Sequence, residues 1–264
     1  MVTLQDVPFV SAIAKWIWGG AQNEKVSPDI CISQFPFLHI ECFKQLLSKC
    51  LGLAIIGGSM LNKLPIMINM WGSQSASGIS RNSLYGEAVV YANGSLYGYL
   101  LQYPFSSYGE NVSLLCQNIV LIGMAWGFSK KTPTPISIQE QLLVVMGFVV
   151  YILAVLSYIP ESYRYMLMSS TWPVMLYARG TQVWETFRVQ HTGNLSIVTT
   201  SMNLVGSLIR ILTTIQETGD LVVLGGYLLS GGLSFIMFVQ YWIYLENSEK
   251  IANEMKQEAK KKEA

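Results

Sequence analysis

The stretch LGLAIIGGSMLNKLPIMINMW, residues 51–71, decides the fold of this chain. It contains one charged residue, Lys63, and it is long enough to cross the hydrocarbon core of a bilayer as a helix, which takes about 20 residues. Pro65 lies in its interior, where a proline removes a backbone hydrogen bond and clashes with the preceding turn. The stretch therefore predicts a membrane-spanning helix with a kink at Pro65, which serves either as a fixed bend or as a hinge.

The composition of the whole chain indicates the same surroundings. Only 12 % of the 264 residues are charged and 51 % are hydrophobic, whereas about 25 % of the residues of an ordinary soluble domain are charged. The 17 Lys and Arg residues nearly balance the 16 Asp and Glu residues, so the chain has no basic field that would attract nucleic acid. We therefore expect the lipid bilayer, and not nucleic acid, as the partner of most of its surface.

Motifs that are typical of enzymes and metal sites are missing from the sequence. The four cysteines, Cys31, Cys42, Cys50 and Cys116, form no C-x-x-C pair and have no histidine at metal-binding spacing, so we interpret them as small apolar residues. Glycine-rich phosphate loops, G-x-S-x-G elbows and H-E-x-x-H pairs do not occur. The sequence thus predicts no catalytic residue, no metal and no cofactor, and a protein that is not an enzyme.

Six further stretches have the length and apolarity of spanning helices. The seven predicted spans are Leu51–Trp71, Leu84–Tyr103, Val112–Phe128, Gln141–Ile159, Tyr165–Phe187, Leu195–Ile215 and Leu221–Leu245. The residues His39–Lys49 follow a helical polar and apolar pattern and are expected to lead directly into the first span. The predicted fold class is therefore an all-α membrane bundle.

The positive charges of the short connections predict how the bundle is oriented, because cytosolic loops carry an excess of Lys and Arg. Alternate connections and the tail hold nine such residues: Arg81, Lys130, Lys131, Arg188, Lys250, Lys256, Lys260, Lys261 and Lys262. The opposite connections hold only Arg164. We therefore expect a cytosolic C-terminus and a lumenal N-terminal segment, residues 1–45, in which Val7–Trp18 is suited to an interfacial helix.

Residues 246–264 form the predicted charged cytosolic tail. It ends in Lys261-Lys262-Glu263-Ala264, and two lysines at these places resemble the dilysine retrieval signal of endoplasmic reticulum membrane proteins, which coat machinery binds. The alternative is a solvated run of charge that follows the positive-inside rule.

Similar landmarks follow one another in the same order in two parts of the chain. The first set of landmarks is Lys63-Leu64-Pro65-Ile66, then Gly78, then Gly-Ser-Leu at 94–96. The second set is Arg179-Gly180-Thr181-Gln182, then Gly193, then Gly-Ser-Leu at 206–208. The sequence predicts a first three-helix repeat at 46–128, a linker helix at 129–160 and a second three-helix repeat at 161–245. Three helices plus one linker helix give both repeats the same orientation, as in parallel-repeat transporters.

Particular strings within these repeats resemble a known family. They are Leu46-Leu47-Ser48-Lys49, Lys63-Leu64-Pro65, Phe105-Ser106-Ser107-Tyr108-Gly109-Glu110, His191-Thr192-Gly193-Asn194-Leu195-Ser196 and Ile215-Gln216-Glu217-Thr218-Gly219-Asp220. The chain resembles the PQ-loop membrane proteins, relatives of the SWEETs, and among them the mannose-phosphate-dolichol utilization defect family, from about His39 to Trp242. Two positions depart from the Pro-Gln pattern: the first repeat has Ile66 after Pro65, and the second has Thr181 before Gln182.

The resemblance implies an endoplasmic reticulum membrane protein that is needed for lumenal use of dolichol-phosphate-mannose and dolichol-phosphate-glucose. Those lipids serve N-glycan assembly, glycosylphosphatidylinositol anchors and protein mannosylation, and the protein would act by translocating them or by presenting them laterally. Two alternatives stay open: a PQ-loop or SWEET-type carrier of a free sugar or amino acid, and a non-transporting partner of glycosyltransferases.

Charged residues within the predicted spans are the first candidates for ligand contact, because charge is expensive in hydrocarbon. Lys63 and Arg179 hold matching repeat positions and could neutralise a phosphodiester, although side chains so near the cytosolic end could also snorkel to the interface. Arg210 is expected to snorkel or to pair with Glu217, and Glu87 to lie near the interface at the start of its span.

Polar amides and prolines complete the candidate set. Asn93, Gln182 and Asn203 could bind sugar hydroxyls, or they could join helices as interhelical hydrogen bonds. Pro173 is expected to kink the fifth span much as Pro65 kinks the first, while Gly78 and Gly193 mark the repeat loops.

Overall fold

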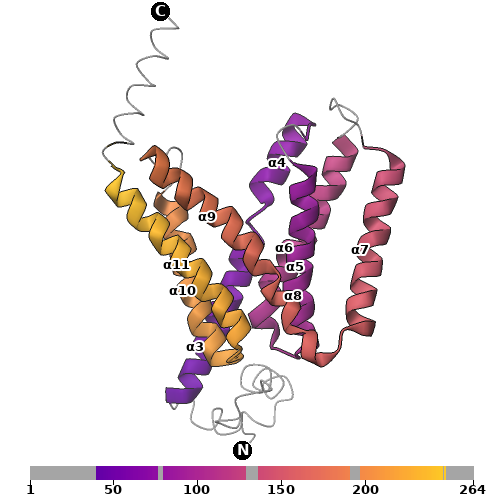
Figure 1. Cartoon of the computed structure of the whole chain (residues 1–264). Helices are drawn as coiled ribbons and strands as arrows, with labels where there is room; N and C mark the ends of the chain where they lie inside the picture. The colour runs from indigo at the N-terminus through magenta and orange to yellow at the C-terminus, as the bar shows by residue number, and fades with distance from the viewer. Residues whose placement is uncertain (1–39, 77–79, 129–135, 191–196, 246, 248–264) are drawn as a thin grey trace, which may run out of the picture. The chain divides into compact units, whose positions relative to one another are not determined.

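The computed structural model describes residues 40–76, 80–128, 136–190, 197–245 and 247, which are helical throughout apart from turns. Its helices are α3 (Ile40–Ser59), α4 (Leu64–Ser73), α5 (Arg81–Leu100), α6 (Phe105–Phe128), α7 (Ile138–Tyr158), the 3₁₀ turn η3 (Glu161–Tyr163), α8 (Tyr165–Ser169), α9 (Thr171–Val189), α10 (Ile197–Glu217) and α11 (Leu221–Ile243). Counting α3 with α4 as one span, the long helices match the seven predicted spans in order and confirm the all-α membrane fold. Figure 1 shows them coloured along the chain.

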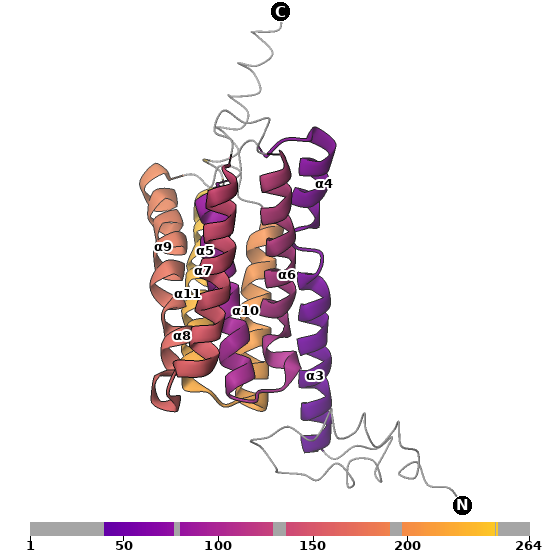
Figure 2. The same ribbon diagram turned by 90° about the vertical axis from the view of Figure 1, so that its right-hand side faces the viewer.

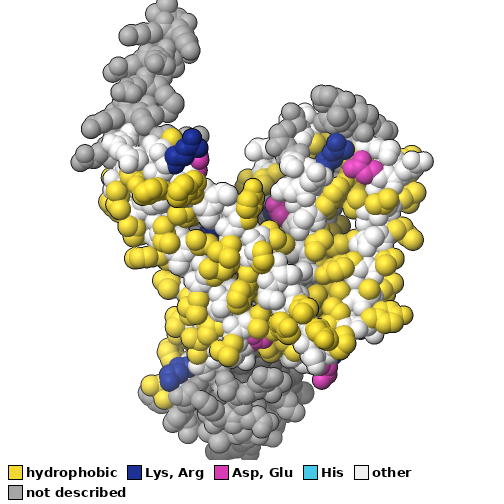
Figure 3. All heavy atoms as spheres, viewed as in Figure 1, with side chains coloured by type: hydrophobic (Ala, Val, Ile, Leu, Met, Phe, Trp, Pro, Cys, Tyr) yellow, Lys and Arg dark blue, Asp and Glu magenta, His cyan; other side chains and the backbone are white. Residues whose placement is uncertain are grey.

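Four segments among the described residues are long and apolar enough to cross a membrane by composition alone: Cys42–Ser73, Phe105–Phe128, Ile138–Tyr158 and Leu221–Ile243. On the face shown in Figure 3, hydrophobic side chains cover most of the described surface along the helices. α5, α9 and α10 do not meet that criterion, since they carry most of the polar and charged side chains predicted within spans. Such side chains are tolerated in a membrane where they face protein.

The described helices pack as two units. The first comprises Met1–Met168 with Thr213–Asp220, and the second comprises Ser169–Leu212 with Leu221–Ala264. α7, the predicted linker helix, packs with α5 in the first unit. These units are defined by which helices pack together, whereas the predicted repeats are defined by landmarks along the sequence. The units therefore do not test the predicted repeat boundaries, which stay a prediction.

In the first unit, α6 packs between α5 on one side and α3 and α4 on the other; Figure 2 shows α3 and α4 end to end beside α6. The core residues Met70, Leu84 and Leu121 join α4, α5 and α6. Two glycines bring α5 close to α6: a Cβ at Gly94 would lie 2.5 Å from Asn111, and one at Gly98 would lie 2.5 Å from Tyr108. This close approach fixes the register of the polar side chains described below.

In the second unit, α11 packs against α9, so that the third helix of each predicted repeat contacts the first. The Trp172 ring of α9 lies over Gly225 and Gly226 of α11, where a Cβ at Gly225 would come within 2.8 Å of it. Gly231 likewise leaves room for the Ser207 side chain of α10.

One cysteine behaves differently from its sequence interpretation. Cys42, buried near the start of α3, is disulfide-bonded, so the interpretation of all four cysteines as merely small apolar residues is wrong for Cys42. Cys50 and Cys116 are free and exposed. Other predicted features lie outside the described residues: the helix at Val7–Trp18, the loop glycines Gly78 and Gly193, and the tail lysines Lys261 and Lys262.

Candidate functional site

The first span is interrupted by a turn at residues 60–63, between α3 and α4. In a continuous helix the Lys63 N–H would donate to the Ser59 carbonyl four residues earlier. Here the Gln117 side chain of α6 lies between the two groups: its Oε1 accepts from Lys63 N at 3.1 Å, and its Nε2 donates to Ser59 O at 2.8 Å. A single amide side chain thus replaces the missing helical hydrogen bond at both ends.

Pro65 stabilises this break but lies after it. It lies in the first turn of α4, where a proline costs no helical hydrogen bond. The Leu61 carbonyl, which a residue other than proline at 65 would bond, accepts instead from Leu64 N at 3.3 Å. The sequence correctly predicts an interruption, and the structure places it two to five residues before Pro65.

The break turns Lys63 into the bundle. Its Nζ donates to Glu87 Oε2 of α5 and, at 2.8 Å, to Asn118 Oδ1 of α6, and it lies 5.3 Å from the centre of the Tyr91 ring. Asn118, which is fully buried, uses its Nδ2 to donate to the Leu84 carbonyl at 2.7 Å. Asn118, one of the two groups that accept a hydrogen bond from Lys63 Nζ, is therefore itself held in place.

Of the two interpretations offered for Lys63, snorkelling requires an extended and accessible side chain, whereas the structure shows an enclosed one. The Lys63 side chain is 9 % exposed while that of Glu87 is 39 % exposed, so the ammonium is enclosed and the carboxylate remains reachable. Glu87 lies within α5, nearly two turns from its start, because the helix begins at Arg81 and not at the predicted Leu84. A cation, a carboxylate and an amide in fixed positions can bind a polar group carrying negative charge and hydroxyls.

The matching position of the second repeat is built differently. α9 runs unbroken through Arg179, whose Nη1 donates to Ser234 Oγ of α11 at 2.9 Å. Pro173 lies in the first turn of α9 and the chain turns before it, at Ser170, so the helix interior stays unkinked there. Gln182 lies on an exposed face of α9.

Four of the remaining candidates, Arg179, Gln182, Asn203 and Arg210, belong to the second unit, and Asn93 belongs to the first. Asn93 is buried on α5 and its Oδ1 accepts from the Tyr151 hydroxyl of α7. On α10, Arg210 is buried and Asn203 is exposed. Within the described part of the first unit, the structure brings Lys63 and Glu87 together from the predicted set, and it adds Gln117, Asn118 and Tyr91.

Sequence reasoning missed a second polar cluster in the first unit, around Glu217 at the end of α10. The Glu217 carboxylate accepts from Ser106 Oγ at 2.7 Å, from Ser107 Oγ at 3.1 Å and from Ser48 Oγ at 3.1 Å. Lys49 Nζ lies 3.9 Å from it and donates to Ser106 Oγ at 3.1 Å. The sequence signals were the string similarity at residues 46–49, 105–110 and 215–220 and the expected pairing of Glu217 with Arg210, neither of which reveals the contacts with Ser48, Lys49 and Ser106.

Asp220, three residues further on, fixes the turn before α11. Its Oδ2 accepts from the hydroxyls of Tyr97 and Tyr103, each at 2.6 Å. Gly219 precedes it with φ +61°, a backbone conformation that favours glycine. The α10 to α11 turn is thereby tied to the α5 to α6 turn.

Replacing Asp220 by alanine is expected to lower the free energy of unfolding by about 1–3 kcal/mol, because both tyrosine hydroxyls lose a charged acceptor. Tyr103→Phe removes one of the two bonds and should cost less. Thermal unfolding of purified protein in detergent measures both changes. Equal midpoints for wild type and Asp220→Ala would contradict the role of this contact.

The same contact predicts how stability depends on alkaline pH. Burial raises the pKa of Tyr103 above its ordinary value of about 10, and the hydrogen bond to Asp220 raises the pKa further. A group whose folded-state pKa is raised stabilises fully below its unfolded-state pKa and loses that contribution as pH rises through the folded-state value. Wild-type stability should therefore fall above about pH 10, and by less in Tyr103→Phe.

Replacing Gln117 by leucine is expected to lower stability by about 1–2 kcal/mol, in the range of interhelical hydrogen bonds in membranes, because Ser59 O and Lys63 N lose their partner. Hydrogen exchange at the Lys63 amide should accelerate in the same variant. Gln139→Leu, at an exposed position of α7, is the matched control. Unchanged exchange at Lys63 would show that Gln117 does not hold the break.

Comparisons with known proteins agree with this architecture. Residues 182–223, from Gln182 of α9 into α11, match the PQ loop repeat family. A solved structure of a eukaryotic SWEET transporter aligns with a TM-score of 0.56 and 13 % sequence identity, covering 78 % of this chain and 98 % of that one. The chain is thus a multi-pass membrane protein whose fold is similar to that of this SWEET transporter, and one part of it matches a PQ loop repeat. At this identity the structural likeness shows the fold alone.

Proposed function

We propose that this chain is a carrier-type protein of the endoplasmic reticulum membrane that makes dolichol-phosphate-mannose and dolichol-phosphate-glucose available at the lumenal side, by translocation or by lateral presentation. The observation that carries the proposal is the enclosed Lys63, paired with Glu87 and Asn118 inside a span. Lys63 would neutralise the phosphodiester, while Glu87 and Asn118 have the acceptors and donors that sugar hydroxyls need. The string similarity noted in the sequence points to the same substrate class.

The orientation we propose has a lumenal N-terminus and a cytosolic C-terminus. Its support is the distribution of Lys and Arg and the disulfide at Cys42, since disulfides form and persist in oxidising compartments. The lysines Lys261 and Lys262 would then lie in the cytosol, where a retrieval signal is bound. No enzymatic activity is proposed.

A second candidate is a carrier of a free sugar or amino acid, which the SWEET-like fold favours. The two differ in whether the transported molecule carries a phosphate and a lipid. A third, a non-transporting partner of glycosyltransferases, predicts no movement of either substrate.

Proteoliposomes containing the full chain separate these functions. We expect them to move a fluorescent dolichol-phosphate-mannose analogue across the bilayer faster than protein-free liposomes, with no uptake of free mannose or glucose. Uptake of the free sugar alone would favour the second candidate. Movement of neither, together with normal flipping in membranes from cells that lack the protein, would overturn translocation.

A further inference from the structure

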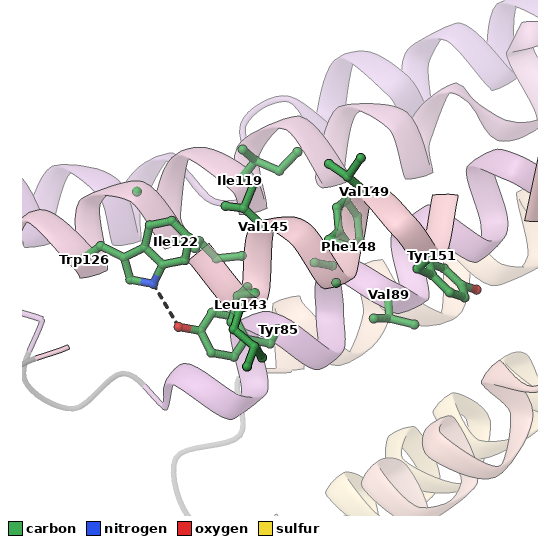
Figure 4. Close-up of a pocket in the computed structure, with 14 residues that line it drawn as sticks. Tyr85, Val89, Ile119, Ile122, Trp126, Leu143, Val145, Phe148, Val149 and Tyr151 are labelled. Atoms are coloured by element: carbon green, nitrogen blue, oxygen red, sulfur yellow. Dashed lines mark hydrogen bonds between the residues drawn. The ribbon is translucent and has the colours of Figure 1, made fainter. Parts of the chain in front are cut away.

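An apolar groove lies in the first unit among α5, α6 and α7, away from Lys63. It has a volume of about 640 Å³ and is walled by side chains such as Val89, Ile119, Ile122 and Phe148 (Figure 4). α6 and α7 are both candidate membrane spans, so the groove lies at hydrocarbon depth. Its occupant must be hydrocarbon, because a polar molecule would find almost no hydrogen-bonding partner there.

Two glycines keep the groove open. Gly123 of α6 and Gly147 of α7 line it, and a Cβ at either would meet nothing within 4 Å. The glycines are therefore not required for contact between the helices. They leave notches along the walls that could receive the methyl branches of a chain.

The two ends of the groove differ chemically. At one end, Trp126 Nε1 donates to the Tyr85 hydroxyl at 2.8 Å, the dashed line in Figure 4. At the other, Tyr151 is hydrogen-bonded to the buried Asn93. Tyrosine and tryptophan with an apolar ring and a polar tip are typical of the membrane interface, which favours the Tyr85 and Trp126 end as the mouth.

A cationic side chain, that of Arg81, lies on the same side of α5 as this mouth, beyond Tyr85. Arg81 precedes Tyr85 by four residues, hence lies on the same side of α5, in the first turn of a helix whose N-terminus favours anions. Its guanidinium lies 3.6 Å from Glu140 of α7, and the two side chains are 34 % and 39 % exposed. Such an exposed pair contributes little to stability and can exchange its carboxylate for a phosphate.

We propose that this groove holds the isoprenoid chain of a polyprenyl phosphate lipid, with the phosphate at Arg81. The choice of an isoprenoid rests on the proposed function. The choice of an anionic lipid rests on Arg81 at the mouth of the groove. The groove and the Lys63 cluster are separate, because Ala88 and Ile119 face the groove while their neighbours Glu87 and Asn118 face Lys63. The groove and Arg81 would hold the lipid before passage, and the Lys63 cluster would bind its phosphodiester and sugar during passage.

The test uses the full chain in nanodiscs and a polyprenyl phosphate with a photoactivatable group in its chain, followed by peptide mapping. We expect labelling of α5, α6 and α7, and loss of most of it in Gly123→Leu and in Gly147→Leu. Gly127→Leu is the matched control: it lies one turn beyond Gly123 in open space and does not line the groove. Arg81→Gln should weaken labelling by the phosphate but not by the corresponding polyprenol.

Three results would overturn the inference: no labelling of these helices, equal loss in Gly127→Leu and Gly147→Leu, or equal displacement of the probe by straight-chain phosphatidic acid. The proposed function is distinguished by the transport assay. Groove labelling without lipid transport leaves the groove and removes translocation. If transport survives in Gly147→Leu and the probe labels other helices, translocation stands and the groove proposal is overturned.

Discussion

Replacing Glu217 by glutamine is expected to lower the free energy of unfolding by about 3–5 kcal/mol, the usual cost of removing one partner of a buried ion pair. The Lys49 and Glu217 side chains are only 7 % and 5 % exposed. Without the carboxylate, the Lys49 ammonium keeps Ser106 as an acceptor but loses the Glu217 charge that lies 3.9 Å from it. Thermal and denaturant unfolding in detergent measure the loss.

A double variant identifies the cause. Lys49→Met alone leaves a buried carboxylate and should be about as costly as Glu217→Gln, whereas the double variant Lys49→Met/Glu217→Gln removes both charges and should cost less than either. Glu161→Gln, which opens the exposed 3.4 Å pair with Arg164, is the control and should change stability by about 0–1 kcal/mol. Additive losses in the double variant would show that the charges act independently.

The positions of the spans could be predicted from the sequence wherever apolarity alone defines the helix. α7 was expected at Gln141–Ile159 and runs from Ile138 to Tyr158. α6 was expected from Val112 but begins at Phe105, because its first two turns are polar. Those turns are helical since Ser106 and Ser107 donate to Glu217, 110 or more residues away in the chain.

In the candidate site, too, some residues could be predicted from the sequence and others could not. Lys63 could be found from the sequence because a charge inside an apolar stretch is conspicuous. Its partners could not, since nothing local tells that Asn118 and Gln117 of α6 meet the break, or that Glu87 faces inward. The break itself follows partly from Pro65 and partly from Gln117, which is a tertiary contact.

Replacing Lys63 by methionine is expected to have the largest effect on the proposed function. If Lys63 binds the phosphodiester, removal of a hydrogen bond to a charged group costs about 1.5–3 kcal/mol, so that affinity for the lipid analogue should fall roughly 10- to 100-fold. The measurement is transport in proteoliposomes at several concentrations of the analogue. Arg179→Met, at the matching position of the second repeat, is the comparison, and a smaller effect is expected because its guanidinium contacts Ser234 in an unbroken helix.

Loss of transport in Lys63→Met has a competing explanation, because the variant leaves Glu87 without its cation. Lys63→Met/Glu87→Gln separates the two, since it removes both charges and should recover the stability of the bundle. If Lys63 and Glu87 only compensate each other's charge and neither contacts the substrate, this double variant will transport at the wild-type rate. If Lys63 binds substrate, it will be as stable as the wild type and still inactive, and Lys63→Arg, which keeps the charge, will retain part of the activity.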